Sequence, residues 1–340
     1  MPGPGLVDLR SDTVTRPTPA MRRAMADAEV GDDQYGEDPS VRALEEAFAQ
    51  RVGKEDALYV PSGVMGNQVA LRVLAPPGSV AIAGRRQHVV AYEHGAAARN
   101  AGVQFHPLPD DDGTIQAGDV AWVRAAADHH WPAPALVCVE NTHMPAGGTT
   151  WPVAALEAVA DAAGGLPVHL DGARLFNAEV ATATPATAWT SLATTVMCCL
   201  SKGLCAPVGS VLAGSAETVA AARQERAVLG GAMRQAGVVA AAGKVALTTM
   251  VERLAEDHER ARRLAAAVAD RWPDAGCDPA RVTTNIVVFG HRRSDDLLEH
   301  LRAEGVLAGS IAPGTVRLVT HHDVDDEGVA RAVKALAGAP

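Results

Sequence analysis

The sequence predicts an α/β fold, in which a large domain with a mainly parallel β-sheet is followed by a small C-terminal α+β domain. Short apolar runs without charged residues alternate with segments of helical periodicity, a pattern typical of parallel sheets covered by helices on both faces. The chain of 340 residues is long enough for both domains. We expect residues 1–247 to form the large domain, including an N-terminal active-site segment, and residues 248–340 to form the small one.

The first 40 residues are polar and rich in Asp, Thr, Gly and Pro, with one short helix expected over residues 19–27. A polar segment of this length inside a compact protein is usually functional or disordered. Tyr35 is its only aromatic residue. The sequence leaves open whether Tyr35 is a packing anchor or part of an active-site wall.

The remaining elements follow from the same alternation. Apolar runs predict strands over residues 57–60, 80–83, 103–106, 136–139, 166–171 and 195–200. Helical spacing predicts helices over residues 40–52, 68–74 and 89–100, and a helical pattern again after Ser210. A long helix over residues 238–271 is expected to bridge the domains. The small domain then alternates strands (284–289 and 316–320) with helices (295–304 and 325–336).

Composition and charge exclude several classes of protein. The formal net charge of −10 argues against nucleic acid or an anionic membrane as the main partner. No segment approaches the ~18 uncharged apolar residues of a membrane span, and charged residues stand where a signal peptide needs an apolar run. The five cysteines are odd in number and lack the spacing of a zinc site. We therefore expect reduced cysteines in a cytoplasmic protein, and no metal.

Polar residues follow several of the predicted strands at the point where the strands end. The carboxyl ends of parallel strands share one edge of the sheet, and ligands bind at that edge. Four strands deliver candidates there: Ser62 and Gly63, Glu140 and His143, Asp171 and Arg174, and Lys202. Any one of them could be structural, but their convergence predicts a ligand site.

Lys202 and Asp171 together fit a site for pyridoxal 5'-phosphate. A partly desolvated lysine amine is a useful nucleophile and can hold this cofactor covalently. A carboxylate can pair with the pyridine nitrogen and keep it protonated, so that the ring accepts electrons. Taken singly, Lys202 could be a surface lysine in a turn and Asp171 a helix N-cap. The two together, with Arg174 beside them, favour the cofactor.

Three further features each allow two interpretations. The turn at Ser62 and Gly63 could aim backbone N–H groups at a phosphate, although every α/β protein has such turns. His88 could cap the helix that follows it or stack on a cofactor ring. Arg317 lies in an apolar strand, where its charge needs an anionic partner. A substrate carboxylate and a structural salt bridge are equally consistent with that position.

Several motifs resemble the L-threonine aldolases, which are fold-type-I pyridoxal phosphate enzymes. They are DLRSDTVTRP (8–17), GDDQYG (31–36), ENTH (140–143), HLDGAR (169–174), LSKGL (200–204) and MRQ (233–235). The similarity extends from residue 8 to about residue 323. It implies cleavage of L-threonine, L-allo-threonine and related β-hydroxy-α-amino acids to glycine and an aldehyde. The alternative is another reaction of the same cofactor on this scaffold, such as β-elimination or racemisation.

The resemblance also implies roles for single residues. Lys202 would hold the cofactor covalently, Asp171 would bind its pyridine nitrogen, and His88 would stack on its ring. The phosphate would be bound by Ser62 and Gly63, with Arg234 reaching in from a neighbouring subunit of a homotetramer. The substrate site would comprise Ser11, Tyr35, His143, Arg174 and Arg317, with Arg174 also near the cofactor. His143 and His88 are the candidate bases for the β-hydroxyl proton, and we favour His143.

Two residues depart from the pattern of this family. Val64 stands where members often carry a second hydroxyl residue after the phosphate-loop glycine, which removes one hydrogen bond to the phosphate. Met144 stands where an asparagine is frequent, at the expected position of the β-substituent. The second departure predicts a different aldehyde preference.

Overall fold

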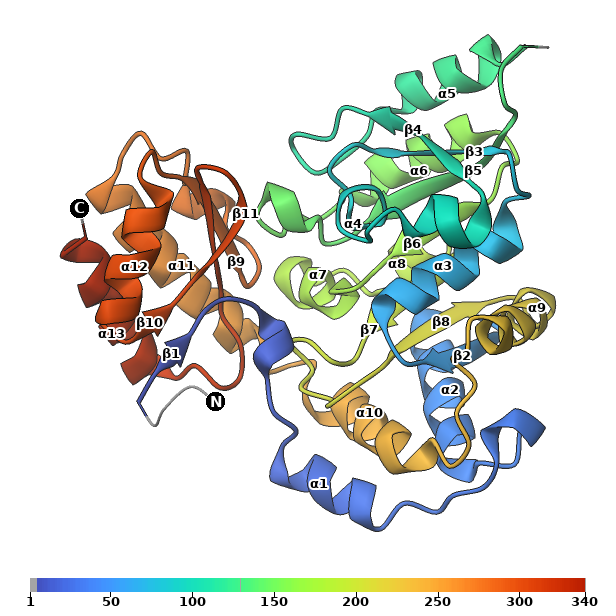
Figure 1. Ribbon diagram of the computed structural model, residues 1–340, viewed down its shortest axis with the longest axis horizontal. Helices are drawn as coiled ribbons and strands as arrows, with labels where there is room; N and C mark the ends of the chain where they lie inside the picture. The colour runs from blue at the N-terminus through green and yellow to red at the C-terminus, as the bar shows by residue number, and fades with distance from the viewer. Residues whose placement is uncertain (1–4, 129, 340) are drawn as a thin grey trace.

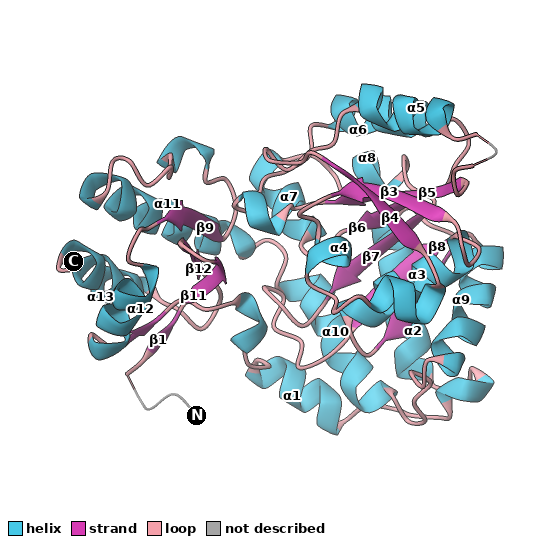
Figure 2. Cartoon of the chain, turned by 45° about the horizontal axis from the view of Figure 1, so that its top comes forward, coloured by secondary structure: helices cyan, strands magenta, loops and turns pink. Residues whose placement is uncertain are grey.

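The computed structural model describes residues 5–128 and 130–339 of the chain. Two domains lie side by side, and the N-terminal segment runs from the small domain to the large one (Figure 1). The large domain is a sheet between two layers of helices, and the small domain packs helices against a short antiparallel sheet (Figure 2). The predicted α/β fold is confirmed. Within the described ranges, no helix is long and apolar enough to cross a membrane.

The large domain is built on a seven-stranded sheet with the order β2-β8-β7-β6-β5-β3-β4. Its strands are β2 (Asp56–Val60), β3 (Val80–Gly84), β4 (Gln104–Leu108), β5 (Pro134–Glu140), β6 (Val168–Asp171), β7 (Thr195–Cys199) and β8 (Ser210–Gly214). All neighbouring pairs are parallel except the two that β8 makes. The carboxyl ends of β2, β5, β6 and β7 therefore share one edge, as predicted.

Each face of the sheet has its own helix layer because successive strand residues point to opposite faces. Tyr59 packs in the layer of α2 (Pro39–Val52), α5 (Ala117–Ala126), α6 (Val153–Ala163), α7 (Leu175–Thr182), α8 (Thr187–Thr190) and α10 (Gly237–Thr249). Its neighbours Leu58 and Val60 pack on α3 (Gly63–Leu74) and α9 (Ala216–Val228). Towards β4, α4 (His88–Ala91) and the π-helical turn η3 (Ala97–Ala101) join that second layer.

The small domain contains a three-stranded antiparallel sheet with the order β11-β12-β9. Its elements are α11 (Leu254–Arg271), η5 (Pro279–Arg281), β9 (Ile286–Gly290), α12 (Ser294–Ala303), β10 (Val306–Leu307), β11 (Gly309–Ala312), β12 (Thr315–Val319) and α13 (Asp326–Ala337). The strand β1 (Val7–Asp8) pairs with β10 in parallel. Val7 and Leu9 belong to the core of this domain, whereas the predicted division assigns these two residues to the large domain. The remaining N-terminal elements are η1 (Asp12–Val14), α1 (Pro19–Ala26) and η2 (Asp33–Tyr35).

Two predicted helices are each divided in the structure. The helix expected over residues 89–100 consists of α4 and η3, because His94 and Gly95 between them have φ angles of 54° and 72°, a left-handed conformation that ends a helix. The helix expected over residues 238–271 is α10 followed by α11. At the end of α10, the Thr248 and Thr249 hydroxyls donate to backbone carbonyls one turn earlier, which bends helices.

Residues 210–214 form β8, where the sequence predicts a helical pattern after Ser210. All five residues are buried, and β8 lies antiparallel between β2 and β7. Periodicity cannot distinguish so short a buried strand from a buried helical turn. The prediction for this segment was therefore wrong.

Candidate active site

A pocket of about 330 Å³ opens at the carboxyl edge of the sheet, between the two domains. Its lining comes from the N-terminal segment, from α4 and its C-terminal end, from the segments that follow β5, β6 and β7, and from β11 and β12. The lining residues are Ser11, Thr13, His88, Tyr92, Met144, Arg174, Lys202, Ser310, Ile311 and Arg317. Five residues of the predicted site therefore share one pocket, namely Ser11, His88, Arg174, Lys202 and Arg317.

Asp171 ends β6 and Lys202 follows the adjacent parallel strand β7, as the sequence predicts. Asp171 pairs with Met197 across β6 and β7, and Lys202 lies in the turn after β7. The backbone carbonyl of Lys202 accepts a hydrogen bond from the Thr15 hydroxyl at 2.9 Å, which ties this turn to the N-terminal segment. The lysine is half-buried and lies near enough to His88 for its charge to act on that imidazole.

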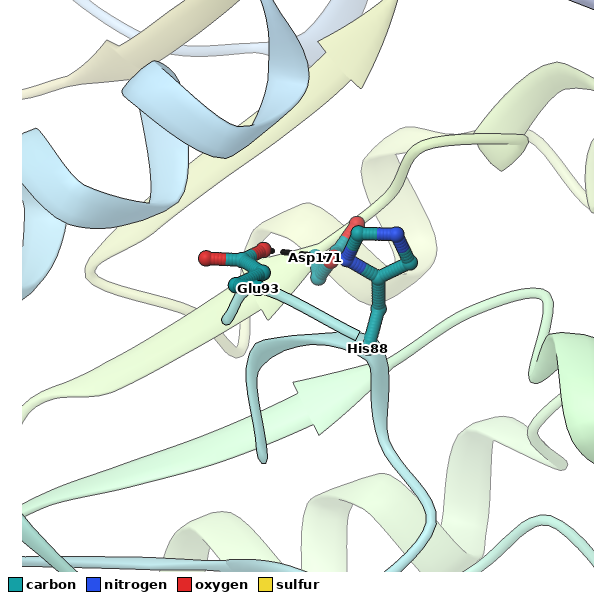
Figure 3. Close-up of side chains that lie close together, drawn as sticks. All are labelled: His88, Glu93 and Asp171. Atoms are coloured by element: carbon teal, nitrogen blue, oxygen red, sulfur yellow. Dashed lines mark hydrogen bonds and ion pairs between the residues drawn. The ribbon is translucent and has the colours of Figure 1, made fainter. Parts of the chain in front are cut away.

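Asp171 is buried at the base of the site, beside His88 and Glu93 (Figure 3). Its Oδ1 accepts from the Ala173 N–H at 3.0 Å, and its Oδ2 accepts from the Asn67 amide at 2.8 Å. The Nδ1 atom of His88 lies 3.0 Å from Glu93 Oε1, within hydrogen-bond distance. The three side chains offer donor atoms within 4.8 Å of one another, a composition that also suits a cation. Amide N–H groups already occupy the oxygens of both carboxylates, which favours a hydrogen-bonded network.

His88 is a titratable group in a mixed environment. Burial lowers the pKa of His88, but the hydrogen bond to Glu93 and the negative charge of Asp171 outweigh burial and raise the pKa above its usual 6.5. The backbone N–H of His88 donates to Glu140 at 2.6 Å, which holds the start of α4 against the end of β5. The Tyr92 ring lies 5.7 Å from the His88 ring.

Two arginines from different domains line the pocket. Arg174 donates from Nε and Nη2 to the two oxygens of the buried Asp12 carboxylate, at 2.7 and 2.6 Å. Burial alone would raise the pKa of Asp12, but the charges of Arg174 and Lys202 hold it well below its usual range. Arg317 donates from Nη2 to the Arg10 carbonyl at 2.8 Å, and its buried Nε has no partner within the described structure. Burial and the charge of Arg174 lower the pKa of Arg317. Two cations at one pocket wall indicate an anion site.

The N-terminus of α3 lies at the same edge of the sheet. Ser62 caps the helix by accepting the Met65 N–H at 3.2 Å. A side chain at Gly63 would place its Cβ 2.7 Å from Cys199 Sγ, so only glycine allows this close approach to the end of β7. The N–H groups of a first helical turn lack partners within the helix and suit a phosphate.

Six predicted site residues are not in the pocket lining. Ser62, Gly63 and Asp171 lie at the same edge of the sheet, as described above, and the other three are His143, Tyr35 and Arg234. His143 is fully buried: its Nδ1 caps the turn η4 (Met144–Ala146) by accepting the Ala146 N–H, and its Nε2 lies 3.0 Å from Asp110. Both ring nitrogens are thus engaged away from Lys202, which the position after β5 could not reveal. Tyr35 is 76% exposed, and Arg234 contacts Asp32 and Gln34 on the surface.

Sequence reasoning missed several residues of the site. Tyr92, Ser310 and Ile311 line the pocket without a motif that marks them. Asp12 and Thr13 lie within the DLRSDTVTRP motif, and that motif was the available signal. Asn67 and Glu93 carried no signal, because neither stands at the end of a strand.

Comparisons with known proteins agree with this geometry. A family model described as beta-eliminating lyase matches residues 8–291. The chain is 42% identical over 336 residues to a probable low-specificity L-threonine aldolase 2 of Arabidopsis thaliana, covering 94% of this chain and 93% of that protein. It is 40% identical over 330 residues to the low specificity L-threonine aldolase of Escherichia coli (strain K12), covering 96% of each. The solved threonine aldolase of Leishmania major superposes with a TM-score of 0.83, covering 97% and 98% of the two chains at 20% identity, which shows a shared fold.

Proposed function

Since the chain belongs to the beta-eliminating lyase family, with low-specificity L-threonine aldolases among its relatives, we propose that it cleaves L-threonine, L-allo-threonine and related β-hydroxy-α-amino acids. The products are glycine and an aldehyde, and the reaction is reversible. One observation carries the proposal. A half-buried lysine and two arginines line one pocket at the carboxyl edge of the sheet, and the buried Asp171 lies beside His88 of the same lining.

The residues of the site fit pyridoxal 5'-phosphate. The buried Asp171 carboxylate accepts only N–H donors from its protein partners, as a partner for a protonated pyridine nitrogen should. Lys202 would hold the cofactor covalently, His88 would face its ring, and Ser62 and Gly63 would bind its phosphate. When bound, the cofactor supplies an electron sink for the pair left on the substrate Cα.

The substrate carboxylate is bound by the arginines. The Nε of Arg317, which has no partner in the described part of the chain, and the charge of Arg174 support this assignment. The hydroxyl of Ser11 lies in the same lining and already accepts from Thr13. An anion between the arginines relieves the cost of burying two like charges together.

His88 takes the role of base that the sequence led us to expect of His143. His88 lines the pocket, whereas both ring nitrogens of His143 are engaged elsewhere. A positioned histidine removes the β-hydroxyl proton while the Cα–Cβ bond breaks, and Cα then gains a proton to give glycine. Because the pKa of His88 is raised, its neutral form becomes available only as the pH rises through that value.

Three apolar side chains support a preference for larger β-substituents. Met144, Tyr92 and Ile311 all line the pocket, and Tyr92 and Ile311 pack against the small cluster that contains Met144. An apolar wall favours substrates such as phenylserine over threonine by the area that the substituent buries.

A homotetramer in the cytoplasm completes the proposal. Tyr35 and Arg234 belong to the site that the family resemblance implies, yet both lie on the surface of a single chain. Contact with a neighbouring subunit would account for both residues. Buried reduced cysteines at all five positions suit a reducing compartment.

The test is product analysis with purified protein, pyridoxal 5'-phosphate and either threonine or phenylserine. Equal amounts of glycine and aldehyde support the aldolase. The family description also fits β-elimination, for which a keto acid and ammonia would appear instead, and formation of the enantiomer would show racemisation. Either of these outcomes as the main reaction contradicts the proposal.

A further inference from the structure

A hydrogen-bonded network lies behind the site and links the carboxylates of Asp171 and Glu93. We call it the Asn67 network, and its members are Thr195, His169, Asn67, Asp171, Glu93, Gln68 and His88. Asn67 is its branch point, because its amide nitrogen donates to Glu93 Oε1 and to Asp171 Oδ2, both at 2.8 Å. Asn67 is 1% exposed and stands on α3, one turn after the helix start.

The orientation of the Asn67 side chain follows from its partners. Ionised carboxylates only accept hydrogen bonds, so the amide NH₂ must face Asp171 and Glu93 and the amide oxygen must face His169. His169 Nε2, 3.0 Å from that oxygen, therefore carries a hydrogen. Burial lowers the pKa of His169 to about 4, so at neutral pH its ring is uncharged and Nδ1 accepts from the Thr195 hydroxyl at 2.9 Å. Each N–H and O–H hydrogen in this series of contacts, from Thr195 through His169 and Asn67 to the carboxylates, then has an acceptor.

The same reasoning fixes the tautomer of His88. Glu93 receives the Asn67 amide on Oε1 and the Gln68 amide, at 2.7 Å, on Oε2. Two amide donors stabilise the charged form of a buried carboxylate. An ionised Glu93 requires a hydrogen on His88 Nδ1, 3.0 Å away, which leaves the lone pair of the neutral ring on Nε2.

We propose that Asn67 is a positioning residue that keeps Asp171 and Glu93 ionised side by side, and so prepares the cofactor site and the base at once. The inference rests on the proposed function, because it assigns the two carboxylates to the cofactor nitrogen and to His88. Two neighbouring carboxylates without a shared donor repel each other, and one of them then takes up a proton. One amide that offers a hydrogen to each removes that competition.

Other titratable groups also lie near the two carboxylates. The charge of Asp171 acts on His88 in α4, Cys138 and Glu140 in β5, His169 in β6 and, from the other face of the sheet, Cys198 in β7, and the charge of Lys202 acts on His88. Burial raises the pKa of both thiols, so they are neutral around pH 7. None of these groups donates to both carboxylates among the described residues. Asn67 alone has that geometry in the described part of the chain.

The experiment measures the dissociation constant of pyridoxal 5'-phosphate for the apoprotein, by fluorescence titration from pH 6 to pH 8. Asn67→Leu keeps the shape of the side chain and removes both donors. We expect weaker binding by about tenfold or more, since hydrogen bonds to charged groups are lost. We also expect the ratio of variant to wild-type constants to grow as the pH falls, because one carboxylate takes up a proton. The ionisation of the cofactor phosphate cancels in that ratio.

Gln68→Leu is the matched control, because Gln68 is an equally buried amide on the same helix that reaches Glu93 and not Asp171. Its constant should stay within about twofold of wild type, whereas disturbed packing of α3 would weaken both variants equally. Asn67→Ser keeps one donor, so its dissociation constant should lie between those of wild type and Asn67→Leu. This variant replaces Asn67→Leu in the experiment if the leucine variant does not fold.

The outcomes separate this inference from the proposed function. A ratio that does not change with pH, or equal losses in the Asn67 and Gln68 variants, means that Asn67 only fills space, and overturns the inference alone. A wild-type apoprotein that does not bind the cofactor overturns both. A pH-dependent loss confined to the Asn67 variants supports the inference.

Discussion

Replacing Arg174 or Arg317 with leucine is expected to weaken substrate binding to the same extent and to change the free energy of unfolding to different extents. Arg174 is bound to the fully buried Asp12 through two hydrogen bonds. Replacing it with leucine leaves that carboxylate without its cation, which costs about 3–5 kcal/mol of unfolding free energy. Among the described residues, Arg317 donates to one backbone carbonyl and its buried Nε has no partner.

The balance for Arg317 is close to zero. An unpaired buried donor costs ~1–3 kcal/mol, and a hydrogen bond from a charged group contributes ~1.5–3 kcal/mol. Arg317→Leu removes both, so we expect unfolding free energy to change by less than about 1 kcal/mol. The lowered pKa of Arg317 also indicates that its charged form does not stabilise the folded protein. A base whose folded-state pKa lies below its unfolded value destabilises the folded state at every pH below the folded-state pKa.

Both variants should lose about 2–5 kcal/mol of substrate binding, or roughly 30- to 5,000-fold in kcat/KM, because the substrate carboxylate loses a charged partner. Thermal unfolding and steady-state kinetics with threonine measure the two effects separately. Arg263→Leu is the control, since its partner Asp326 is exposed and neither quantity should change. If Arg317→Leu destabilises the protein as much as Arg174→Leu and leaves kcat/KM intact, Arg317 is structural and the reasoning fails.

Four further predictions concern the pocket and the buried His143 behind it. Lys202→Ala should abolish turnover and the covalent attachment that borohydride reduction traps, and mass spectrometry that still finds the reduced adduct would refute the assignment. His88→Phe should lower kcat by ~10²–10⁴-fold and remove the acidic limb of the kcat/KM profile, which in wild type lies above pH 6.5 because the pKa of His88 is raised. His143→Phe should mainly lower the melting temperature by breaking the buried contact to Asp110, and the reverse pattern would make His143 the base. Met144→Asn should lower kcat/KM for phenylserine relative to threonine by roughly 10-fold, and an unchanged ratio would exclude Met144 from the side-chain subsite.

The sequence was informative where a side chain follows a buried strand. The ends of β6 and β7 were marked by apolar runs that stop at Asp171 and Lys202, and parallel pairing of these strands brings the two residues to one edge. The same logic placed His143 near the site but could not give the direction of its ring. That direction depends on which N–H the imidazole caps, and η4 determines it.

Other features lie beyond any local pattern. Val7 pairs with Val306, which lies almost at the other end of the sequence. The strands β1 and β10 that contain them have two residues each, too few to show an alternation of apolar and polar residues. Asn67 and Glu93 come into contact only when α3 and the segment that follows α4 in the chain pack on the same face of the sheet. Such contacts are set by tertiary packing, whereas periodicity reports only which face of an element is buried.

The N-terminal segment connects the two arginines that we propose bind the substrate carboxylate, although they belong to different domains. Arg317, in the small domain, donates to the backbone carbonyl of Arg10, and Arg174, in the large domain, binds the carboxylate of Asp12. These anchors are two residues apart in the chain. Asn285 of the small domain also donates to Asp12, at 3.1 Å, and β1 fixes the start of the segment to β10. The distance between the arginines is therefore set by a short piece of backbone held at both ends, so a change at Asp12 should alter substrate binding through both domains.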